Sequence, residues 1–310
     1  MTGAKRIHEK HGVALVTGAS SGIGAELAIE FARHGHPVVL AGRDAARLSA
    51  VAGRIKRETG RDSETLVADL ASAGGVDRIV SALKERDIEP AFIVNAAGFG
   101  RFGLAGKLDA AEQVAIVNVN CAALTELTVR LLPGALAQRG GILNVGSVGG
   151  FFPGPGMSAY FASKAYVHSF SQALRSEYLG HGLRVSALCP GPVPTGFQAR
   201  AGMVAPRLPR LLGRDARSVA VAGYRGLMRN RAVVVPGPFL NFLMVAAGGL
   251  IFHRAFAPFV RWYHLRRRDR ARGMSKDIGR EATLSRKSTE PVKSRASRAT
   301  TSLRNPTAAS

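Results

Sequence analysis

Short apolar runs alternate with longer stretches of helical periodicity through most of the chain. The first run, residues 13–17, is followed by glycines, as is typical of a buried strand. Apolar positions then recur at helical spacing over residues 25–33, and a more polar helix is expected over residues 44–58. The seven expected strands are residues 13–17, 37–41, 65–68, 92–94, 142–145, 184–188 and 232–235.

This alternation of strands and helices predicts the fold. Parallel strands joined by right-handed helical crossovers form a sheet that helices cover on both faces. The sequence therefore predicts an α/β fold, a Rossmann-type doubly wound parallel sheet of about seven strands. We expect a single domain over residues 13–237, with an N-terminal arm at residues 1–12 and a C-terminal extension.

The extension begins with an uncharged stretch, residues 232–252, in which Pro236 and Pro238 should break any helix. The remaining residues 239–252 would form a helix about 21 Å long, shorter than the roughly 30 Å hydrocarbon core of a bilayer. We therefore expect an apolar helix with a basic flank over residues 238–268, and no full membrane span. The alternatives are that it packs on the domain, covers the substrate pocket or enters one leaflet of an anionic membrane surface.

Positive charge is concentrated at the C-terminus. The 310 residues carry a formal net charge of +22, and residues 261–310 hold 14 Lys and Arg against 4 Asp and Glu. Residues 271–310 contain no Phe, Trp or Tyr, so residues 269–310 are interpreted as a disordered basic tail. The tail is either a solvated extension or a region that attracts anionic lipid. Nucleic acid is not an expected partner, because no nucleic-acid-binding module accompanies the tail.

The rest of the composition is that of a packed intracellular protein. Hydrophobic residues make up 46% of the chain, which excludes wholesale disorder. Cys121 and Cys189 are too few for a disulfide framework, so a reducing, cytoplasmic location is expected, with peripheral attachment to a membrane as an alternative. No metal is expected, because no His, Cys and Asp cluster has metal-ligand spacing.

The turn after the first strand carries the first chemical signal. Residues 17–24 read TGASSGIG and lie between the first strand and the first helix. Glycines at Gly18, Gly22 and Gly24 let the chain turn sharply and let the backbone approach a pyrophosphate, toward which the helix N-terminus points its N–H groups. This position at a strand–helix junction predicts nucleotide binding.

The end of the second strand bears on the choice of cofactor. An acidic residue there would bind the adenosine ribose hydroxyls of NAD. The sequence instead has Arg43, whose charge suits a 2′-phosphate, followed by Asp44, which is expected to cap the next helix. NADP(H) is therefore favoured over NAD(H). The alternative is that Arg43 is a solvent-exposed loop charge.

Ser147, Tyr160 and Lys164 carry the second chemical signal. Tyr160 and Lys164 are four residues apart, so they share a helix face. An ammonium near a phenol lowers the pKa of the phenol, which makes tyrosine a usable general acid or base. Ser147 follows the fifth strand at the carboxyl edge of the sheet, where ligands bind in such folds. The alternative is that Tyr160 and Lys164 are only a pair on the surface of a helix. The glycine turn and Ser147, both earlier in the chain, make this alternative less favourable.

With these motifs the sequence resembles the classical short-chain dehydrogenase/reductase family over about residues 13–237. The resemblance implies that Tyr160 exchanges a proton with the substrate oxygen and that Ser147 holds that oxygen. It implies that Lys164 binds the nicotinamide ribose and tunes Tyr160, and that Asn120 retains a water molecule linked to the lysine. Asn118 is the rival for the asparagine role. The implied catalytic set is therefore Asn120, Ser147, Tyr160 and Lys164.

The resemblance also implies a cofactor site. Asp69 would contact the adenine amino group, whether or not it also caps a helix, and residues 95–98 would form a wall beside the adenine ribose. Pro190, Gly191 and Thr195 would meet the nicotinamide carboxamide. The implied cofactor-binding residues are Gly18, Ser20, Ser21, Gly22, Ile23, Gly24, Arg43, Asp69, Leu70, Asn95, Ala96, Gly98, Tyr160, Lys164, Pro190, Gly191, Val193 and Thr195.

These residues predict an NADP-dependent oxidoreductase that interconverts an alcohol and a carbonyl. An apolar small-molecule substrate is expected because several apolar side chains flank the site in sequence, although they could instead fill the core or a subunit interface. Residues 198–214 are expected to cover the site, and the protein is expected to be a homo-oligomer. The rival function is a non-catalytic, nucleotide-bound scaffold that uses the basic tail, which would not need all four catalytic residues. The flanking apolar residues are Phe99, Phe102, Phe151, Phe152 and Met157.

Overall fold

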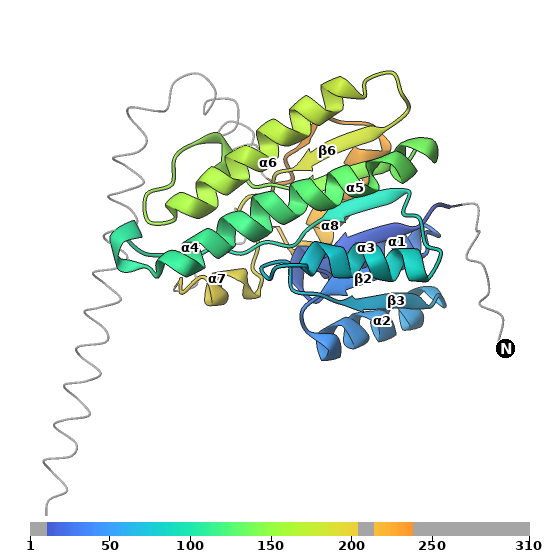
Figure 1. Ribbon diagram of the computed structural model, residues 1–310, viewed down its shortest axis with the longest axis horizontal. Coiled ribbons are helices and arrows are strands. Elements are labelled where there is room, and N and C mark those ends of the chain that lie inside the picture. Colours follow the sequence, from blue (N-terminus) through green and yellow to red (C-terminus); the bar gives the residue numbers. More distant parts are fainter. Residues whose placement is uncertain (1–10, 204–213, 238–310) are drawn as a thin grey trace, which may run out of the picture. The chain divides into compact units, whose positions relative to one another are not determined.

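Seven parallel strands form one sheet in the order β3-β2-β1-β4-β5-β6-β7 (Figure 1). The computed structural model describes residues 11–203 and 214–237. The predicted doubly wound parallel sheet is confirmed, and each expected strand lies within two residues of its observed bounds. The strands are β1 (Ala14–Thr17), β2 (Val38–Gly42), β3 (Ser63–Val67), β4 (Phe92–Asn95), β5 (Gly141–Val145), β6 (Arg184–Leu188) and β7 (Val233–Val234).

Two layers of helices cover the sheet. On one face α1, α2 and α8 surround a core that includes Leu27, Leu48 and Leu227. On the other face α3, α5 and α6 cover two further clusters, around Leu127 and around Leu174 (Figure 1). The helices are α1 (Gly22–Arg33), α2 (Ala45–Thr59), α3 (Gly75–Glu85), α4 (Ala110–Val117), α5 (Leu124–Ala137), α6 (Ser158–Glu177), α7 (Gly196–Arg200) and α8 (Ala216–Met228).

The bounds of α2 follow from local sequence signals. Asp44 precedes the helix, and its carboxylate accepts a hydrogen bond from the Arg47 N–H at 3.0 Å, which is the predicted N-cap. Gly60 ends the helix with a φ of 72°, a left-handed conformation that glycine adopts without steric cost. These signals fix where α2 begins, directly after the end of β2, and where it ends.

One helical stretch among the described residues, Ala110–Ala137, is long and apolar enough to cross a membrane by length and composition. Its most apolar window is 44% buried within the fold. Leu127 and Leu132 of this stretch lie in the core clusters beneath α5. The core of the fold therefore accounts for much of its apolar character.

Several predictions fall on residues outside the described ranges. These are the arm at residues 1–10, the apolar helix and basic tail within residues 238–310, and residues 204–213 of the expected cover. They remain predictions from the sequence.

Candidate active site

The order of the strands brings distant parts of the sequence to one edge of the sheet. The chain leaves β1 toward β2 on one side, while β4, β5 and β6 continue on the other, so the strand order reverses between β1 and β4. Ligands bind outside the carboxyl ends of the strands at such a switch point. The residues that follow β1, β4, β5 and β6 include the glycine turn, residues 96–100, Ser147 and Pro190.

The glycine turn between β1 and α1 is built for close backbone approach. Gly18 and Gly22 have φ values of 65° and 59°, which other residues rarely adopt. A Cβ atom on Gly18 would lie 2.7 Å from the backbone of Ala97, and one on Gly24 would lie 2.3 Å from the Gly18 carbonyl oxygen. Ser21 forms the N-cap of α1 without a side-chain hydrogen bond. The first N–H groups of α1 therefore fit a pyrophosphate.

Residues of the turn also touch the neighbouring segments that were predicted to bind the cofactor. Thr17 Oγ1 accepts hydrogen bonds from the N–H groups of Ala96 and Ala97, both at 3.2 Å. A Cβ atom on Gly42, at the end of β2, would lie 3.6 Å from Ser20 Oγ. Arg43 follows directly and is exposed. The turn thus lies between the end of β2 and the segment after β4.

Ser147 and Tyr160 form the centre of the site. Ser147 follows β5 and precedes a 3₁₀ turn, Val148–Phe151, and its Oγ accepts a hydrogen bond from the Gly149 N–H at 3.0 Å. Tyr160 lies in the first turn of α6. Burial raises the pKa of Tyr160 to about 12, and a hydrogen bond with the Ser147 side chain acts in the opposite direction. The serine and tyrosine side chains therefore meet at the carboxyl edge.

Lys164 lies one turn after Tyr160 and is only 5% exposed. Its Nζ donates a hydrogen bond to the Val145 carbonyl at 2.8 Å and lies 5.7 Å from the centroid of the Tyr160 ring. Burial lowers the pKa of Lys164 to about 8. The expectation that the lysine would lower the pKa of Tyr160 is wrong for this structure, because burial of the phenol dominates.

Asn120 lies beside the lysine, whereas its rival Asn118 is exposed. A single π-helical segment, Asn118–Ala123, joins α4 to α5 and contains Asn120. Asn120 Oδ1 accepts from the Phe99 N–H at 3.1 Å, and its Nδ2 donates to Ser163 Oγ at 2.9 Å. A Cβ atom on Gly98 would lie 3.0 Å from Asn120 Oδ1 and 3.4 Å from Lys164 Nζ. The structure therefore brings Asn120, and not Asn118, to the site.

The Asn95 side chain differs from its predicted placement, and Asp69 does not have the alternative role of a helix cap. Asn95 Nδ2 donates to Thr128 Oγ1 at 2.9 Å and to Asn144 Oδ1 at 2.8 Å, so this side chain is directed into the core instead of toward a cofactor. Asp69 does not cap a helix, because α3 begins only at Gly75 after the N-cap Gly74. Its Oδ1 instead accepts from the Ala71 N–H at 3.0 Å and stabilises the turn after β3, where Leu70 packs on the core.

The segment after β6 borders the site next to the glycine turn. The Pro190 carbonyl accepts a hydrogen bond from the Val148 N–H at 3.1 Å, next to Ser147. Val193 is buried in the core, and Gly191 lies between Pro190 and Val193 in the sequence. Thr195 caps α7 in a capping box with Gln198, and a Cβ atom on Gly22 would lie 3.4 Å from the Thr195 side chain. Ile23, in the first turn of α1, packs on the core.

The apolar rim of the site is only partly the one predicted. Met157 and the Tyr160 ring both lie 2.9 Å from the position of a Cβ on Gly100. Phe151 and Phe152 instead pack on His168 and Phe161 of α6, with ring centroids 4.3 and 5.8 Å apart.

Sequence reasoning missed Phe197, whose ring centroid lies 5.2 Å from that of Tyr160. Its position two residues after Thr195, directly before the expected cover, was the available signal.

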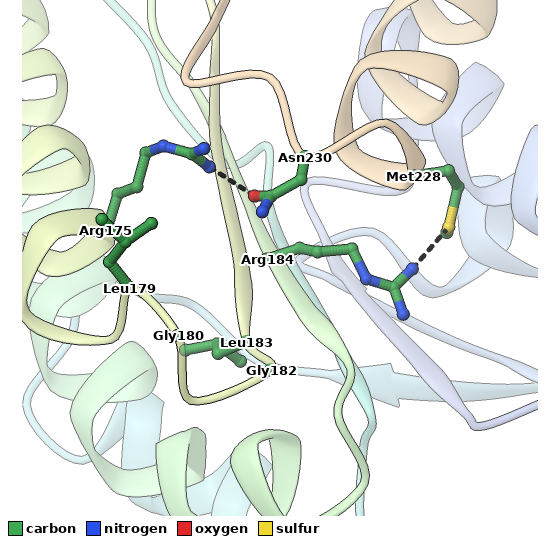
Figure 2. Close-up of a pocket in the computed structure, with 8 residues that line it drawn as sticks. All are labelled: Arg175, Leu179, Gly180, Gly182, Leu183, Arg184, Met228 and Asn230. Carbon is green, nitrogen blue, oxygen red and sulfur yellow. Dashed lines mark hydrogen bonds between the residues drawn. The ribbon is translucent and has the colours of Figure 1, made fainter.

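A separate cavity of about 400 Å³ lies at the opposite, amino edge of the sheet (Figure 2). Arg175 of α6 donates hydrogen bonds to the Asn230 side chain and, at 3.2 Å, to the Val185 carbonyl. Arg184 donates to Met228 Sδ at 3.1 Å and to the Arg139 carbonyl at 2.9 Å. None of the predicted catalytic or cofactor residues lines this cavity.

The glycine turn and the Ser147, Tyr160 and Lys164 arrangement together define a nicotinamide-dependent oxidoreductase of Rossmann type. Residues 12–203 match the family model described as short chain dehydrogenase, and the chain belongs to this family. It is an NAD(P)-dependent oxidoreductase that acts on CH–OH groups.

Three known proteins illustrate the similarity. An uncharacterized oxidoreductase of Staphylococcus saprophyticus is 38% identical over 184 residues, which is 59% of this chain and 79% of that protein. A short-chain dehydrogenase from Sphingobium yanoikuyae, solved in complex with NADPH, is 35% identical with a TM-score of 0.68, covering 79% of this chain and 97% of the other. The bulky-bulky ketone specific alcohol dehydrogenase from Comamonas testosteroni is 32% identical with a TM-score of 0.66, covering 80% and 97%.

Proposed function

We propose that this chain is an NADPH-dependent reductase of bulky, apolar ketones and aldehydes, which also oxidises the corresponding alcohols. The observation that carries the proposal is the contact between the Ser147 and Tyr160 side chains beside the buried Lys164, at the edge where the glycine turn lies. A nucleotide-bound scaffold would need the glycine turn alone, so this convergence favours the enzyme.

The chain's own groups perform the proton chemistry. The Gly149 N–H orients Ser147 Oγ, which leaves the serine proton free to bond the substrate carbonyl oxygen. Tyr160 donates its phenolic proton to the same oxygen. With its pKa raised to about 12, Tyr160 is protonated at neutral pH, the form that reduction requires. When bound, the nicotinamide cofactor supplies or accepts the hydride.

Lys164 and Asn120 support this proton transfer. Lys164 Nζ is fixed by the Val145 carbonyl, so its charge is held at a constant distance from the Tyr160 ring. Asn120 is fixed by both polar groups of the Phe99 backbone, at 3.1 Å each. The Asn120 and Lys164 side chains, each held by a backbone carbonyl, thus lie together next to Gly98.

The preference for NADPH rests on the end of β2. Arg43 is exposed there, while Asp44 is engaged as the cap of α2 and lies 3.2 Å from Arg47 Nε. No free carboxylate therefore competes for the ribose among the described residues at this strand end. The NADPH complex of the Sphingobium yanoikuyae relative supports the same choice.

The apolar substrate class rests on the rim of the site. Met157 and Phe197 lie beside the Tyr160 ring, and the bulky-ketone specificity of the Comamonas testosteroni relative supports a similar preference. Such a rim desolvates a large apolar ligand better than a small hydroxy acid.

The test combines binding and turnover. We expect NADPH to be oxidised in the presence of bulky aromatic or aliphatic ketones, and NADPH to bind at least about tenfold more tightly than NADH, as one charge-assisted contact provides. Arg43→Ala should narrow that difference. Tight NADPH binding without oxidation by any of a broad set of ketones and aldehydes would favour the scaffold instead.

We also propose that the enzyme self-associates through the outer faces of α4, α5 and α6. Val114, Val117 and Val129 are 57%, 45% and 53% exposed, and Tyr166 of α6 is 40% exposed. Burial of such an apolar face against a second copy would remove it from water. Light scattering of Val117→Glu/Val129→Glu should report a smaller mass than that of the wild type. Leu179→Glu, an exposed site at the other edge, is the control.

The C-terminal extension leads to a further proposal, made on the sequence alone. We propose a cytoplasmic enzyme whose residues 239–310 attach it peripherally to anionic membranes, through the uncharged helix and the arginines at 266–268. Flotation with anionic vesicles should retain the full chain at high salt and lose it after truncation at Gly237. Absence of binding at low salt would contradict the attachment.

A further inference from the structure

Helix α7 lies against the glycine turn at its first end and carries an arginine, Arg200, at its last residue. A Cβ atom on Gly22 would lie 3.4 Å from Thr195, so the start of α7 contacts the turn directly. Arg200 ends α7, but its side chain folds back, because a Cβ on Gly196 would lie 3.0 Å from Arg200 Nη1. The Arg200 guanidinium therefore lies near the start of α7, the end of the helix that contacts the turn.

The surroundings of Arg200 are positive. Partial burial lowers the pKa of Arg200, and the charges of Arg47, in the first turn of α2, and of Arg43, directly after β2, lower it further. Neither Arg43 nor Arg200 forms an ion pair within the described residues, and the neighbouring Asp44 is engaged by Arg47. Cations that approach one another without a carboxylate between them repel, and an anion bound among them removes this repulsion.

The backbone of Arg200 is held in place from the other side. Arg101, in the loop after β4, donates a hydrogen bond to the Arg200 carbonyl. The Arg101 guanidinium is itself held by Glu112 of α4 in a two-point pair, at 3.0 and 2.6 Å. The Phe102 N–H also donates to the Ala201 carbonyl at 2.8 Å. Binding of an anion would thus have to order only the Arg200 side chain, and not the helix.

We propose that Arg200 is a second cation for the 2′-phosphate of NADP(H), acting together with Arg43 across the glycine turn. The inference rests on the proposed preference for NADPH and deepens it. Phe197 of the same helix lies against Tyr160, so a phosphate that fixes Arg200 also fixes one wall of the substrate site. Arg200 is therefore a residue that determines cofactor specificity and links cofactor binding to the position of α7.

Calorimetry with cofactor fragments tests the contact without turnover. The probes are 2′,5′-ADP, which carries the ribose 2′-phosphate, and ADP, which carries only the pyrophosphate. Arg200→Ala should weaken 2′,5′-ADP and NADPH by about tenfold or more, as loss of a hydrogen bond between charged groups does, and should change ADP and NADH less than about twofold. Arg200→Lys should keep part of the affinity, and Arg57→Ala, at the far end of α2, controls for the loss of one positive charge.

A second measurement follows α7 itself. Hydrogen exchange of residues 195–203 should be slowed more by NADPH than by NADH, and Arg200→Ala should abolish that difference. Equal loss of 2′,5′-ADP and ADP binding would assign Arg200 to the pyrophosphate and overturn the proposal. Unchanged binding of both would mean that Arg200 is a solvated surface charge. A wild type that binds NADH as tightly as NADPH would instead contradict the proposed function, whatever Arg200 does.

Discussion

At the amino edge of the sheet His36 and two arginines are bonded to other protein groups, whereas at the carboxyl edge backbone N–H groups and an arginine side chain are left available for a ligand. His36 is 5% exposed, and both of its ring nitrogens are engaged, Nδ1 by the Gly12 carbonyl at 3.0 Å and Nε2 by the Tyr224 hydroxyl at 3.1 Å. At the carboxyl edge the first N–H groups of α1 have no side-chain cap, and Arg43 has no ion pair within the described residues.

The difference teaches how to recognise the functional edge of such a sheet. The cavity at the amino edge contains two arginines, but their donors are bonded to backbone carbonyls, to Asn230 and to Met228 (Figure 2). The arginine donors at that edge are therefore engaged within the protein. At the carboxyl edge the uncapped N–H groups of α1 and the Arg43 side chain instead suit a ligand that carries phosphate.

The largest expected effect at the carboxyl edge is on turnover. Tyr160→Phe keeps the ring that packs on Phe197 but removes the proton, so kcat should fall by about 10²–10⁴-fold. NADPH affinity should stay within about threefold of the wild type, since no phosphate contact is changed. Stopped-flow turnover and fluorescence titration measure the two quantities. Turnover close to that of the wild type would remove Tyr160 from the proposed mechanism.

The next effect is on cofactor binding. Gly24→Ala would place a methyl group 2.3 Å from the Gly18 carbonyl oxygen and force the glycine turn to shift. Overpacking of this kind costs about 1–3 kcal/mol, so NADPH affinity should fall by roughly 5- to 150-fold if the cost falls on the bound form. Gly106→Ala is the matched control, because a Cβ there meets no atom within 4 Å. Equal affinities for the two variants would argue against a cofactor at this turn.

A smaller effect, on stability, is expected at the amino edge. Burial lowers the pKa of His36, opposed by the Gly12 carbonyl and aided by the positive charges of His11, His34 and Arg184. A histidine whose folded pKa is lowered binds its proton more readily in the unfolded chain. Its contribution is therefore complete above about pH 6.5 and is lost as the pH falls below that value.

The measurement for His36 is the free energy of unfolding between pH 7 and 5. The wild type should lose stability with a slope that exceeds that of His36→Gln by at most about 1.4 kcal/mol per pH unit, the limit for one proton. Glu30, which lies 3.7 Å from His34 Nδ1, is present in both proteins and cancels in the comparison. Identical slopes would show that His36 does not titrate differently on folding.

The smallest effect on activity is expected at the amino-edge cavity. Arg175→Met keeps the aliphatic part of the side chain but removes the hydrogen bonds to the Val185 carbonyl and Asn230. The free energy of unfolding should fall by about 0.5–1.5 kcal/mol for each bond lost, with kcat/KM within twofold of the wild type. A loss of activity as large as that of Gly24→Ala would mean that the amino edge also binds a ligand.

The sequence by itself determined the fold class and much of the site. Apolar runs of strand length separated by helical stretches specify a parallel sheet, because only right-handed crossovers bury both faces. Motifs that follow β1, β5 and β6 must then share one edge, so Ser147 and Pro190 could be placed together without coordinates. Tyr160 and Lys164 share a helix face through the α-helical repeat alone.

Only the tertiary structure decided which side chains reach that edge. A π-helical segment between α4 and α5 buries Asn120 and leaves Asn118 exposed, and helical periodicity does not specify such a segment. Asn95 stands in a motif that follows β4, yet its amide is directed to Thr128 and Asn144, because a strand places successive side chains on opposite faces.

The same holds for contacts between segments that are far apart in the chain. Phe197 reaches Tyr160, and Thr195 reaches the glycine turn, only because α7 folds over the switch point of the sheet. Burial, and not the nearby lysine, sets the direction in which the pKa of Tyr160 moves. Periodicity and motif spacing act over one or two turns of chain, whereas burial and electrostatic fields depend on everything packed around a group, which the fold alone assembles.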